Sequence, residues 1–487
     1  MQQMQPLRVL STTFEHRVLV ALLVFPWVHS FAPGPLSNLV PWLISWAALA
    51  LVMLHWRHLS SGVVAQSWAI AALLSSLIGL VQFFGLADAF ASVMHVPVYS
   101  GDAFGNLRQR NQQATLLTMG MFAVLAWHAW GLSRKHALWM LVVLALGLAA
   151  TASRTGLLQA LFLVFWMVLH RRAPAGTSTW ILSAATLVVY LLASLVLPQL
   201  LGHLTGQLTG SALTRMVNLD GCGERQVLWS NVLHLIDQKP WTGWGWDELR
   251  YAHYITSYTG PRFCDILGNA HNLPLHVAFV WGIPAALMVF VGLAWLVLRA
   301  RPWRHSGTEM QLAWGVLGVI GLHSMLEYPL WYGPFQVAVV LALWLLGGRM
   351  ALAVRNVVWP RPTALVLLAL LAFVAYDYAQ VRQIYLPAHQ RWSVWRDNPL
   401  DAAQRSWFFP GAALFAEVTT TRLSQDNARW LLEASQRALH TAPEARVIEK
   451  LLESAHWLQE EELFLVHKER YQEVDPKKYQ AWLSRQR

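Results

Sequence analysis

The sequence predicts an all-α integral membrane protein with about eleven transmembrane helices, a large outer loop and a C-terminal helical domain. Hydrophobic residues make up 56% of the 487 residues, and only 13% are charged. Long uncharged runs are typical of membrane spans, although the shorter ones are expected to be tilted or partly re-entrant. The eleven runs cover residues 18–32, 36–56, 62–84, 112–131, 136–152, 156–170, 178–200, 274–298, 311–326, 335–347 and 363–380. A purely soluble enzyme is therefore excluded.

Basic residues in the short loops predict the orientation, because short cytoplasmic loops retain Lys and Arg. One side carries thirteen, namely Arg8, Arg17, Arg57, Arg134, Lys135, Arg171, Arg172, Arg299, Arg301, Arg304, Arg349, Arg355 and Arg361. The short loops of the other side carry three, Arg108, Arg110 and Arg154. The N-terminus is therefore expected to be cytoplasmic, with an uncleaved first span. The odd number of spans places the loop 201–273 and the C-terminal tail outside, which in a bacterium is the periplasm.

Two parts of the chain are predicted, a membrane part over residues 1–380 that includes the loop 201–273, and a soluble helical tail over residues 381–487. In the tail, Trp, Leu and Ala recur at helical spacing, and fifteen Lys and Arg nearly balance fourteen Asp and Glu. The stretches 427–440 and 444–462 alternate apolar and charged faces, with Pro443 and Pro476 as breakers. The net charge of +10 follows mostly from the cytoplasmic loops, so no nucleic acid is expected as a partner.

Charged residues are almost absent at membrane depth. The predicted spans contain no Asp, Glu, Lys or Arg apart from Asp377 at the outer end of the last span. Proton and ion relays usually keep ionisable residues within the membrane, where they are costly and are retained for function. A lipid or glycan transporter is therefore only a remote alternative, and chemistry at the outer rim is favoured.

Two outer segments carry guanidinium and amide groups. Seven of the nine residues in segment 105–113 are Arg, Asn or Gln, among them Arg108, Gln109 and Asn111, which can donate hydrogen bonds to phosphate or sugar oxygens. Arg154 lies alone in a very short outer turn, where its planar fork would match a lipid phosphate. An interfacial belt in the first segment and an ordinary headgroup contact in the second are the alternatives.

The loop 201–273 contains an amphipathic stretch that starts at Glu224 and Arg225. Its apolar face is formed by Leu228, Val232, Leu235 and Ile236. We expect a helix along the membrane plane, followed at 240–246 by an aromatic turn at the interface, where Trp is favoured. The loop also holds both cysteines, Cys222 and Cys264, which an oxidising compartment would allow to form a disulfide. Two unpaired thiols are the alternative.

The loop ends at His271 and Asn272, where the next predicted span begins. Histidine is suited to accept a proton near neutral pH, and Pro274 is suited to the first turn of a helix. On spacing alone, a structural histidine is the alternative. A last outer segment, 323–332, interrupts an apolar run with His323, Glu327, Tyr328 and Tyr332.

These motifs together resemble the O-antigen ligase and polymerase superfamily, whose members are multi-span periplasmic glycosyltransferases. The matching residues are Arg154 with Leu158, Glu224-Arg225 followed by Pro240 and Gly243-Trp244-Gly245, and His271-Asn272 spaced to Gly282. Segments 105–111 and 327–331, with the helical tail, are similar to PglL-type protein O-oligosaccharyltransferases. The chain has Ala285 where the superfamily often has Thr or Tyr. The resemblance implies a GT-C-like architecture in the bacterial inner membrane.

The resemblance implies en bloc transfer of a preassembled glycan from an undecaprenyl diphosphate carrier to a Ser or Thr hydroxyl of a periplasmic protein such as pilin. No cofactor and no metal are expected, since the first outer loop, 31–38, lacks the acidic residues on which the metal-dependent N-linked enzymes rely. An O-antigen ligase or chain polymerase is the alternative, with the same donor and a different acceptor. The helical tail favours a protein acceptor.

Roles follow from this chemistry. Arg154, Arg225 and Arg108 are assigned to the leaving diphosphate, whose developing negative charge needs cations. His271 is the expected general base on the acceptor hydroxyl, and Glu327 is the competing base. Glycan or acceptor binding is assigned to Gln109, Asn111, Glu224, Asn272, His323, Tyr328 and Tyr332. Inversion at the anomeric carbon is expected if no covalent glycosyl-enzyme forms.

Overall fold

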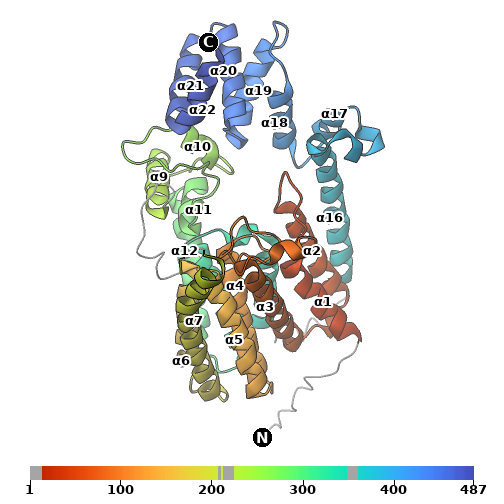
Figure 1. Ribbon diagram of the computed structural model, residues 1–487, viewed down its shortest axis with the longest axis vertical. Coiled ribbons are helices and arrows are strands. Elements are labelled where there is room, and N and C mark those ends of the chain that lie inside the picture. Colours follow the sequence, from red (N-terminus) through yellow and green to blue (C-terminus); the bar gives the residue numbers. More distant parts are fainter. Residues whose placement is uncertain (1–13, 207–209, 212–223, 348–359, 487) are drawn as a thin grey trace. The chain divides into compact units, whose positions relative to one another are not determined.

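The computed structural model describes residues 14–206, 210–211, 224–347 and 360–486 (Figure 1). Within these ranges the regular structure is helical and contains no strand, which confirms the all-α class. The chain forms two compact units, one of residues 1–219 and 295–371 and the other of residues 220–294 and 372–487. The sequence division at residue 380 differs from this partition, because the loop before residue 294 packs with the tail.

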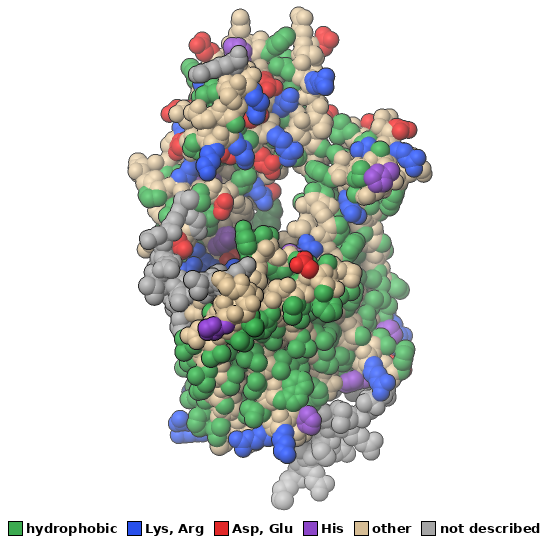
Figure 2. All heavy atoms as spheres, in the orientation of Figure 1, with side chains coloured by type: hydrophobic (Ala, Val, Ile, Leu, Met, Phe, Trp, Pro, Cys, Tyr) green, Lys and Arg blue, Asp and Glu red, His purple; other side chains and the backbone are tan. Residues whose placement is uncertain are grey.

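The first unit contains most of the apolar helices. They are α1 (Phe14–Val28), α2 (Leu39–Leu54), α3 (Ser61–Phe83), α4 (Arg110–Ala129), α5 (Arg134–Ala150), α6 (Arg154–Leu169), α7 (Gly176–Thr205), α13 (Thr308–Ser324) and α14 (Gly333–Leu346). Two further helices, α12 (Ile283–Ala300) and α16 (Pro360–Arg382), have residues in both units. On the face that Figure 2 shows, hydrophobic side chains cover the helices of the first unit, and Lys and Arg gather at one end of them.

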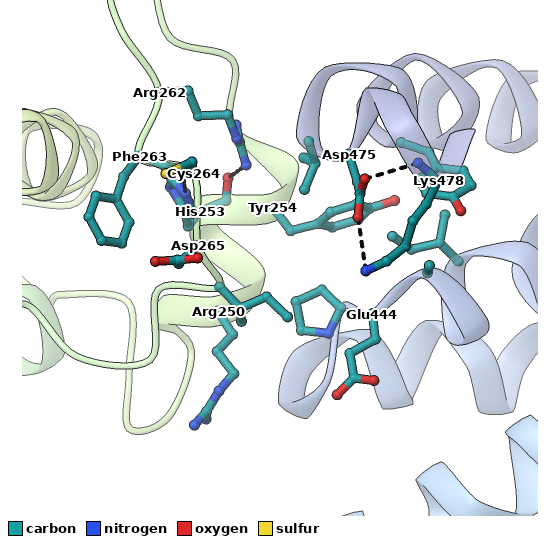
Figure 3. A pocket seen from close by; sticks show the side chains of 16 residues that line it. Arg250, His253, Tyr254, Arg262, Phe263, Cys264, Asp265, Glu444, Asp475 and Lys478 are labelled. Carbon is teal, nitrogen blue, oxygen red and sulfur yellow. Dashed lines mark hydrogen bonds and ion pairs between the residues drawn. The ribbon is translucent and has the colours of Figure 1, made fainter. Parts of the chain in front are cut away.

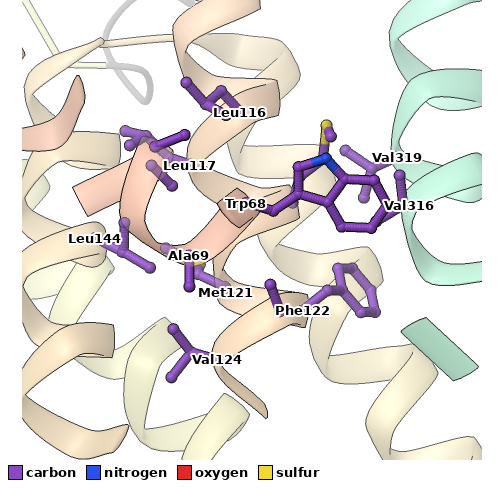
Figure 4. Close-up of a cluster of buried hydrophobic side chains, with 14 of the residues drawn as sticks. Trp68, Ala69, Leu116, Leu117, Met121, Phe122, Val124, Leu144, Val316 and Val319 are labelled. Carbon is purple, nitrogen blue, oxygen red and sulfur yellow. The ribbon is translucent and has the colours of Figure 1, made fainter. Parts of the chain in front are cut away.

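Helix α4 is the centre of the first unit. Its residues from Asn111 to Ala126 are all buried, and it packs against α3, α5, α6 and α13. Figure 4 shows Leu116, Phe122 and their neighbours in this core. A side chain on Gly120 would clash with Ala72 of α3, so glycine is what allows these two helices to approach closely.

Helices occur at the positions of all eleven predicted spans, and the protein is a membrane protein. In the part of the chain that the structure describes, four helical segments are long and apolar enough to cross a bilayer, namely Ser61–Phe83, Gly176–Thr205, Ile283–Arg304 and Pro360–Tyr385. Crossing by the shorter helices, and the orientation of the chain, stay predictions. One predicted span is wrong in its bounds. The run 274–298 is two helices, because Gly282 adopts φ +86° and separates α11 (Leu273–Trp281) from α12.

The second unit combines the loop with the tail. The loop supplies α9 (Arg225–Gln238) and α10 (Leu249–Ile255), and α11 follows where the loop ends. The tail consists of α17 (Pro399–Gln404), α18 (Pro410–Thr420), α19 (Ala428–Thr441), α20 (Ala445–Trp457), α21 (Glu461–Val474) and α22 (Pro476–Gln486). The predicted helical tail is confirmed, although the stretch 444–462 ends its helix at Trp457, with Gln459 at φ +59° in the turn before α21.

Loop and tail share one hydrophobic core. Tyr254 of α10 is 2% exposed and packs among the apolar faces of α19, α20 and α21. Its hydroxyl lies 2.9 Å from Nδ1 of His467. Arg262 contacts Glu473 at 3.7 Å, and Nδ1 of His440 lies 2.7 Å from a carboxylate oxygen of Glu248. The loop and the tail therefore form one folded unit with a common core.

Acidification is expected to destabilise the second unit. Burial, with Arg470 nearby, lowers the pKa of His467 to about 4. The unfolded chain would bind a proton near pH 6.5, so the stability from neutral His467 is complete above that pH and is lost as pH falls towards 4. The free energy of unfolding should fall by up to about 1.4 kcal/mol per pH unit for this group.

Thermal unfolding of the detergent-solubilised protein between pH 7 and pH 5 tests this expectation. His467→Gln keeps an acceptor for the Tyr254 hydroxyl without the titration, so its loss of stability on acidification should be smaller. His456→Gln, at an exposed position of the same tail, is the control. Equal pH dependence of all three proteins would contradict the assignment.

Candidate active site

In the first unit, the predicted polar segment before α4 is held by two buried amides. Oε1 of Gln82 accepts from the backbone N–H groups of Phe104 and Gly105, at 3.0 and 2.7 Å. Asn106 donates to the carbonyl oxygens of Val28 and Val93. The loop is therefore fixed against the end of α1 and the segment that follows α3.

Arg108 and Gln109 lie at the end of this loop. Arg108 is exposed, has φ +61°, and donates to the carbonyls of Ser30 and Ala32 at 2.8 and 3.3 Å. Partial burial lowers the pKa of its guanidinium, which stays cationic at neutral pH. The Gln109 side chain accepts from the N–H of Gln112 at 2.6 Å and so caps α4.

Asn111 connects two other predicted residues. Its Nδ2 donates to Oε1 of Glu327 at 3.1 Å, although the two residues are 216 positions apart. Its Oδ1 accepts from the hydroxyl of Ser153 at 2.6 Å. Ser153 also caps α6, whose first residue is Arg154. One amide therefore links the acidic candidate with the turn that carries the arginine.

A buried polar chain includes the predicted His323 together with Thr115 and Gln159, two residues that the sequence analysis did not single out. The Thr115 hydroxyl lies 2.9 Å from Nδ1 of His323 and accepts from Nε2 of Gln159 at 2.8 Å. His323 is 1% exposed, so in this structure it contacts Thr115 and the ring of Phe335 rather than solvent. Uncharged polar residues inside apolar runs could have indicated this chain, because buried polar groups need hydrogen-bond partners.

Tyr328 and Tyr332 follow Glu327 in the same segment. Their rings stack with centroids 5.9 Å apart. Burial raises the pKa of Tyr332, hydrogen bonds with Tyr328, Asn38 and Gln112 act in the opposite direction, and Glu327 raises it again. The Tyr332 hydroxyl is therefore a neutral hydrogen-bonding group, placed among amides and beside the Glu327 carboxylate.

In the second unit, the end of the loop places His271 with a constrained backbone. His271 has φ +50°, and its N–H donates to Oδ1 of Asn269 at 2.9 Å. The preceding carbonyl, of Ala270, accepts from the indole N–H of Trp229 on α9 at 3.1 Å. Asn272 follows as the cap of α11, accepting from the N–H of Leu275 at 3.0 Å. The sequence suggested that His271 precedes a membrane span. In the structure it precedes the short helix α11.

The glycines of the predicted motif have a structural explanation. The segment 240–245 docks on the end of α11, with Trp244 and Gly245 donating to the carbonyls of Phe279 and Val280 at 2.8 and 3.1 Å. Ile283 donates back to the carbonyl of Pro240 at 2.7 Å. A side chain on Gly282 would clash with the Trp241 carbonyl. The motif therefore joins α9 to the helix that follows His271.

Gly282→Ala is expected to lower the free energy of unfolding by about 1–3 kcal/mol, because alanine is strained at φ +86° and clashes with the docked segment. Thermal unfolding of the purified protein measures the loss. Gly292→Ala in α12, where the added methyl meets no atom within 4 Å, is the matched control. An unchanged melting temperature for Gly282→Ala would contradict the docking role.

Two further loop predictions can be compared with the structure. The apolar face of α9 is 0–5% exposed and packs against α11 and its neighbours, so it faces a protein core rather than lipid as predicted. Trp241 and Trp246 are exposed, and the interfacial position of their turn stays a prediction. Cys264 is disulfide-bonded, and the other cysteine, Cys222, lies outside the described residues.

The predicted residues are divided between the two units, and within the first unit Asn111 links Glu327 to the turn before Arg154. The group in the first unit is Arg108, Gln109, Asn111, Arg154, His323, Glu327, Tyr328 and Tyr332. The group in the second unit is Glu224, Arg225, His271 and Asn272, with Glu224 and Arg225 at the start of α9. Among the described residues, no cluster of three or more His, Cys, Asp or Glu could hold a metal ion.

Three families match successive parts of the chain, and each covers part of these groups. Residues 103–128 match the protein glycosylation ligase family, and residues 139–290 match the O-antigen ligase family. Residues 311–487 match the C-terminal part of the virulence factor membrane-bound polymerase family. The predicted resemblance to PglL-type O-oligosaccharyltransferases of the O-antigen ligase superfamily is confirmed.

The chain is also similar to the general O-oligosaccharyltransferase of Acinetobacter baylyi, with 26% identity over 278 residues. The match covers 55% of this chain and 47% of that protein, so the chain spans about half the length of the curated relative that it matches. No solved structure matches the chain.

Proposed function

We propose that this protein is a protein O-oligosaccharyltransferase that moves a preassembled glycan from undecaprenyl diphosphate to a Ser or Thr hydroxyl of a periplasmic protein such as pilin. The observation that carries the proposal is the shared core of the loop and the tail, because it joins the segment that ends at His271 to a helical domain of protein-binding size. The similarity to a general O-oligosaccharyltransferase supports the same acceptor class.

The donor chemistry is assigned to the arginines. Breaking the bond between the anomeric carbon and the diphosphate leaves negative charge on a phosphate oxygen, and guanidinium groups stabilise that charge with paired hydrogen bonds. Arg154, at the start of α6, is the first candidate, since Ser153 and Asn111 fix the turn that carries it. Arg225 and Arg108 are the others. No metal is assigned a role.

His271 is assigned as the general base. It removes the proton of the acceptor hydroxyl as that oxygen attacks the anomeric carbon, which predicts inversion in a single displacement. Its backbone is held by Asn269 and, through Ala270, by Trp229, which preorganises its position. Glu327 is the competing base, and Tyr328 and Tyr332 beside it would bind glycan or acceptor.

An O-antigen ligase or polymerase is the alternative, favoured by the match of residues 139–290 to the O-antigen ligase family. Co-expression with a lipid-linked glycan pathway and a candidate pilin in a ligase-deficient bacterium separates the two. A pilin mass raised by one glycan, in cells that carry this protein, supports the proposal. Glycan on lipopolysaccharide with unmodified pilin favours the ligase.

A further inference from the structure

A cavity of about 510 Å³ lies within the second unit (Figure 3). One wall is the loop segment 250–266, and the other is formed by α20, α21 and α22 of the tail. Tyr254 and Tyr471 lie behind its wall and are 2% and 0% exposed, whereas Ile266 at the cavity wall is 50% exposed. Volumes of about 300–1,000 Å³ are typical of ligand sites, so a short peptide segment fits, whereas a folded domain does not.

The cations of this cavity are already matched. Arg262 donates to the carbonyls of His253 and Thr256 and lies 3.7 Å from Glu473. Arg250 pairs with Asp247 at 2.6 Å, and Lys478 pairs with Asp475 at 3.0 Å. None of the three is therefore available to a second anion without loss of a contact.

Two acids of the cavity are poorly matched, one on each wall. Asp265 of the loop is exposed, and it makes no ion pair or hydrogen bond with the described part of the chain. Within the described residues, the carboxylate of Glu444 in the tail pairs only with Arg446, at 3.5 Å between side chains that are 43% and 66% exposed. The cavity thus presents two carboxylates, Asp265 and Glu444, beside the exposed Ile266.

This chemistry distinguishes between the two substrates of the proposed reaction. The carboxylates of Asp265 and Glu444 would repel a lipid diphosphate. The cations Arg250, Arg262 and Lys478 already have partners and would offset this repulsion only by losing a contact. A polypeptide with a Lys or Arg side chain would gain the carboxylates of Asp265 and Glu444. The cavity therefore suits the acceptor and not the donor.

The cavity wall and His271 are held by the same helix. Asn231 of α9 accepts from the N–H of Phe263 at 2.8 Å and donates to the carbonyl of Pro261 at 3.0 Å. Two residues earlier on α9, Trp229 donates to the carbonyl of Ala270, next to His271. A segment bound in the cavity would be positioned on the scaffold that also positions the assigned base.

We infer that the cavity between segment 250–266 and the tail binds a segment of the acceptor polypeptide that carries a basic side chain, with Asp265 and Glu444 as its partners. This inference rests on the proposed function. It makes the enzyme selective for acceptors with Lys or Arg near the glycosylated hydroxyl.

The test uses the full-length protein in proteoliposomes with a lipid-linked glycan. The acceptors are pilin-type proteins that share one Ser and carry Lys, Gln or Glu at each flanking position in turn. One of these flanking positions is expected to occupy the cavity. For the wild type, the KM of the acceptor with Lys at that position should be about fivefold below the KM of the acceptor with Glu there, with kcat unchanged. Asp265→Lys combined with Glu444→Lys should reverse the order. Glu433→Lys, at an exposed position of α19 away from the cavity, should preserve it.

A KM that ignores flanking charge in the wild type, or an order that the double variant leaves unchanged, would overturn the inference. A photo-crosslinking residue at Ile266 tests it without a charge change and should capture the acceptor, whereas one at the exposed Trp457, away from the cavity, should not. No capture at position 266 during active transfer would also overturn it. Failure of the wild type to modify any protein would instead reject the proposed function, and the inference with it.

Discussion

Replacing His271 is expected to lower kcat for glycan transfer by about two to four orders of magnitude, with little change in KM for the donor. The physical reason is the loss of the group that takes the proton from the acceptor hydroxyl. Because His271 has φ +50°, His271→Ala also strains the backbone, whereas His271→Asn removes the base at a residue that tolerates this conformation. Initial rates with a lipid-linked donor and a purified acceptor, for both variants, measure the effect.

The matched controls are His234→Ala and Glu327→Gln. His234 is an exposed histidine of α9 in the same unit, and its loss should leave the rate near that of the wild type. Glu327→Gln keeps an acceptor for the Asn111 amide but removes the competing base. A slow Glu327→Gln together with an active His271→Asn would transfer the role of base to Glu327 and leave the transferase itself standing.

Arg154→Ala is expected to lower kcat by about two to three orders of magnitude, because it removes a preorganised cation from the leaving diphosphate. Arg154→Lys should recover only part of the rate, since a single ammonium cannot bind two phosphate oxygens as a planar fork does. The measurement is kcat and donor KM for both variants, with Arg172→Ala, an exposed arginine after α6, as control.

A donor KM that rises in Arg154→Ala while kcat stays constant would assign Arg154 to ground-state binding of the headgroup. Equal rates for the Ala variant and the wild type would return Arg154 to an ordinary headgroup contact. Complete recovery by Lys would show that charge, and not the fork geometry, is what the site uses.

Hydropathy predicted the helices well, because each apolar run needs only its own residues to be recognised. The error at 274–298 arose because Gly282 is a single residue in a continuous apolar run. Its φ of +86° is required by the docking of segment 240–245, which is a contact that no local pattern reveals. The partnership between α10 and the tail was missed for the same reason, since Tyr254 meets His467 only after folding.

The sequence singles out the charged candidates, whose roles stay predictions, but not the polar side chains that hold some of them in place. Arg154, Glu327 and His271 stand out because ionisable groups are scarce in this chain. Thr115 and Gln159 do not, because hydroxyl and amide side chains are common in apolar helices and become informative only when a partner is known. The link of Asn111 to Glu327 and Ser153 depends on three separate helices or their ends and is visible only in three dimensions.

The built-in position of α10 limits how this protein can be recombined with its relatives. A chimera that exchanges only the tail would separate Tyr254 from His467 and Arg262 from Glu473, and would leave the loop with half of its core missing. The smallest piece that can be grafted intact is residues 220–294 together with 372–487. Acceptor specificity would then be transferred only when the loop and the tail are exchanged together, and the two segments are expected to change together in evolution.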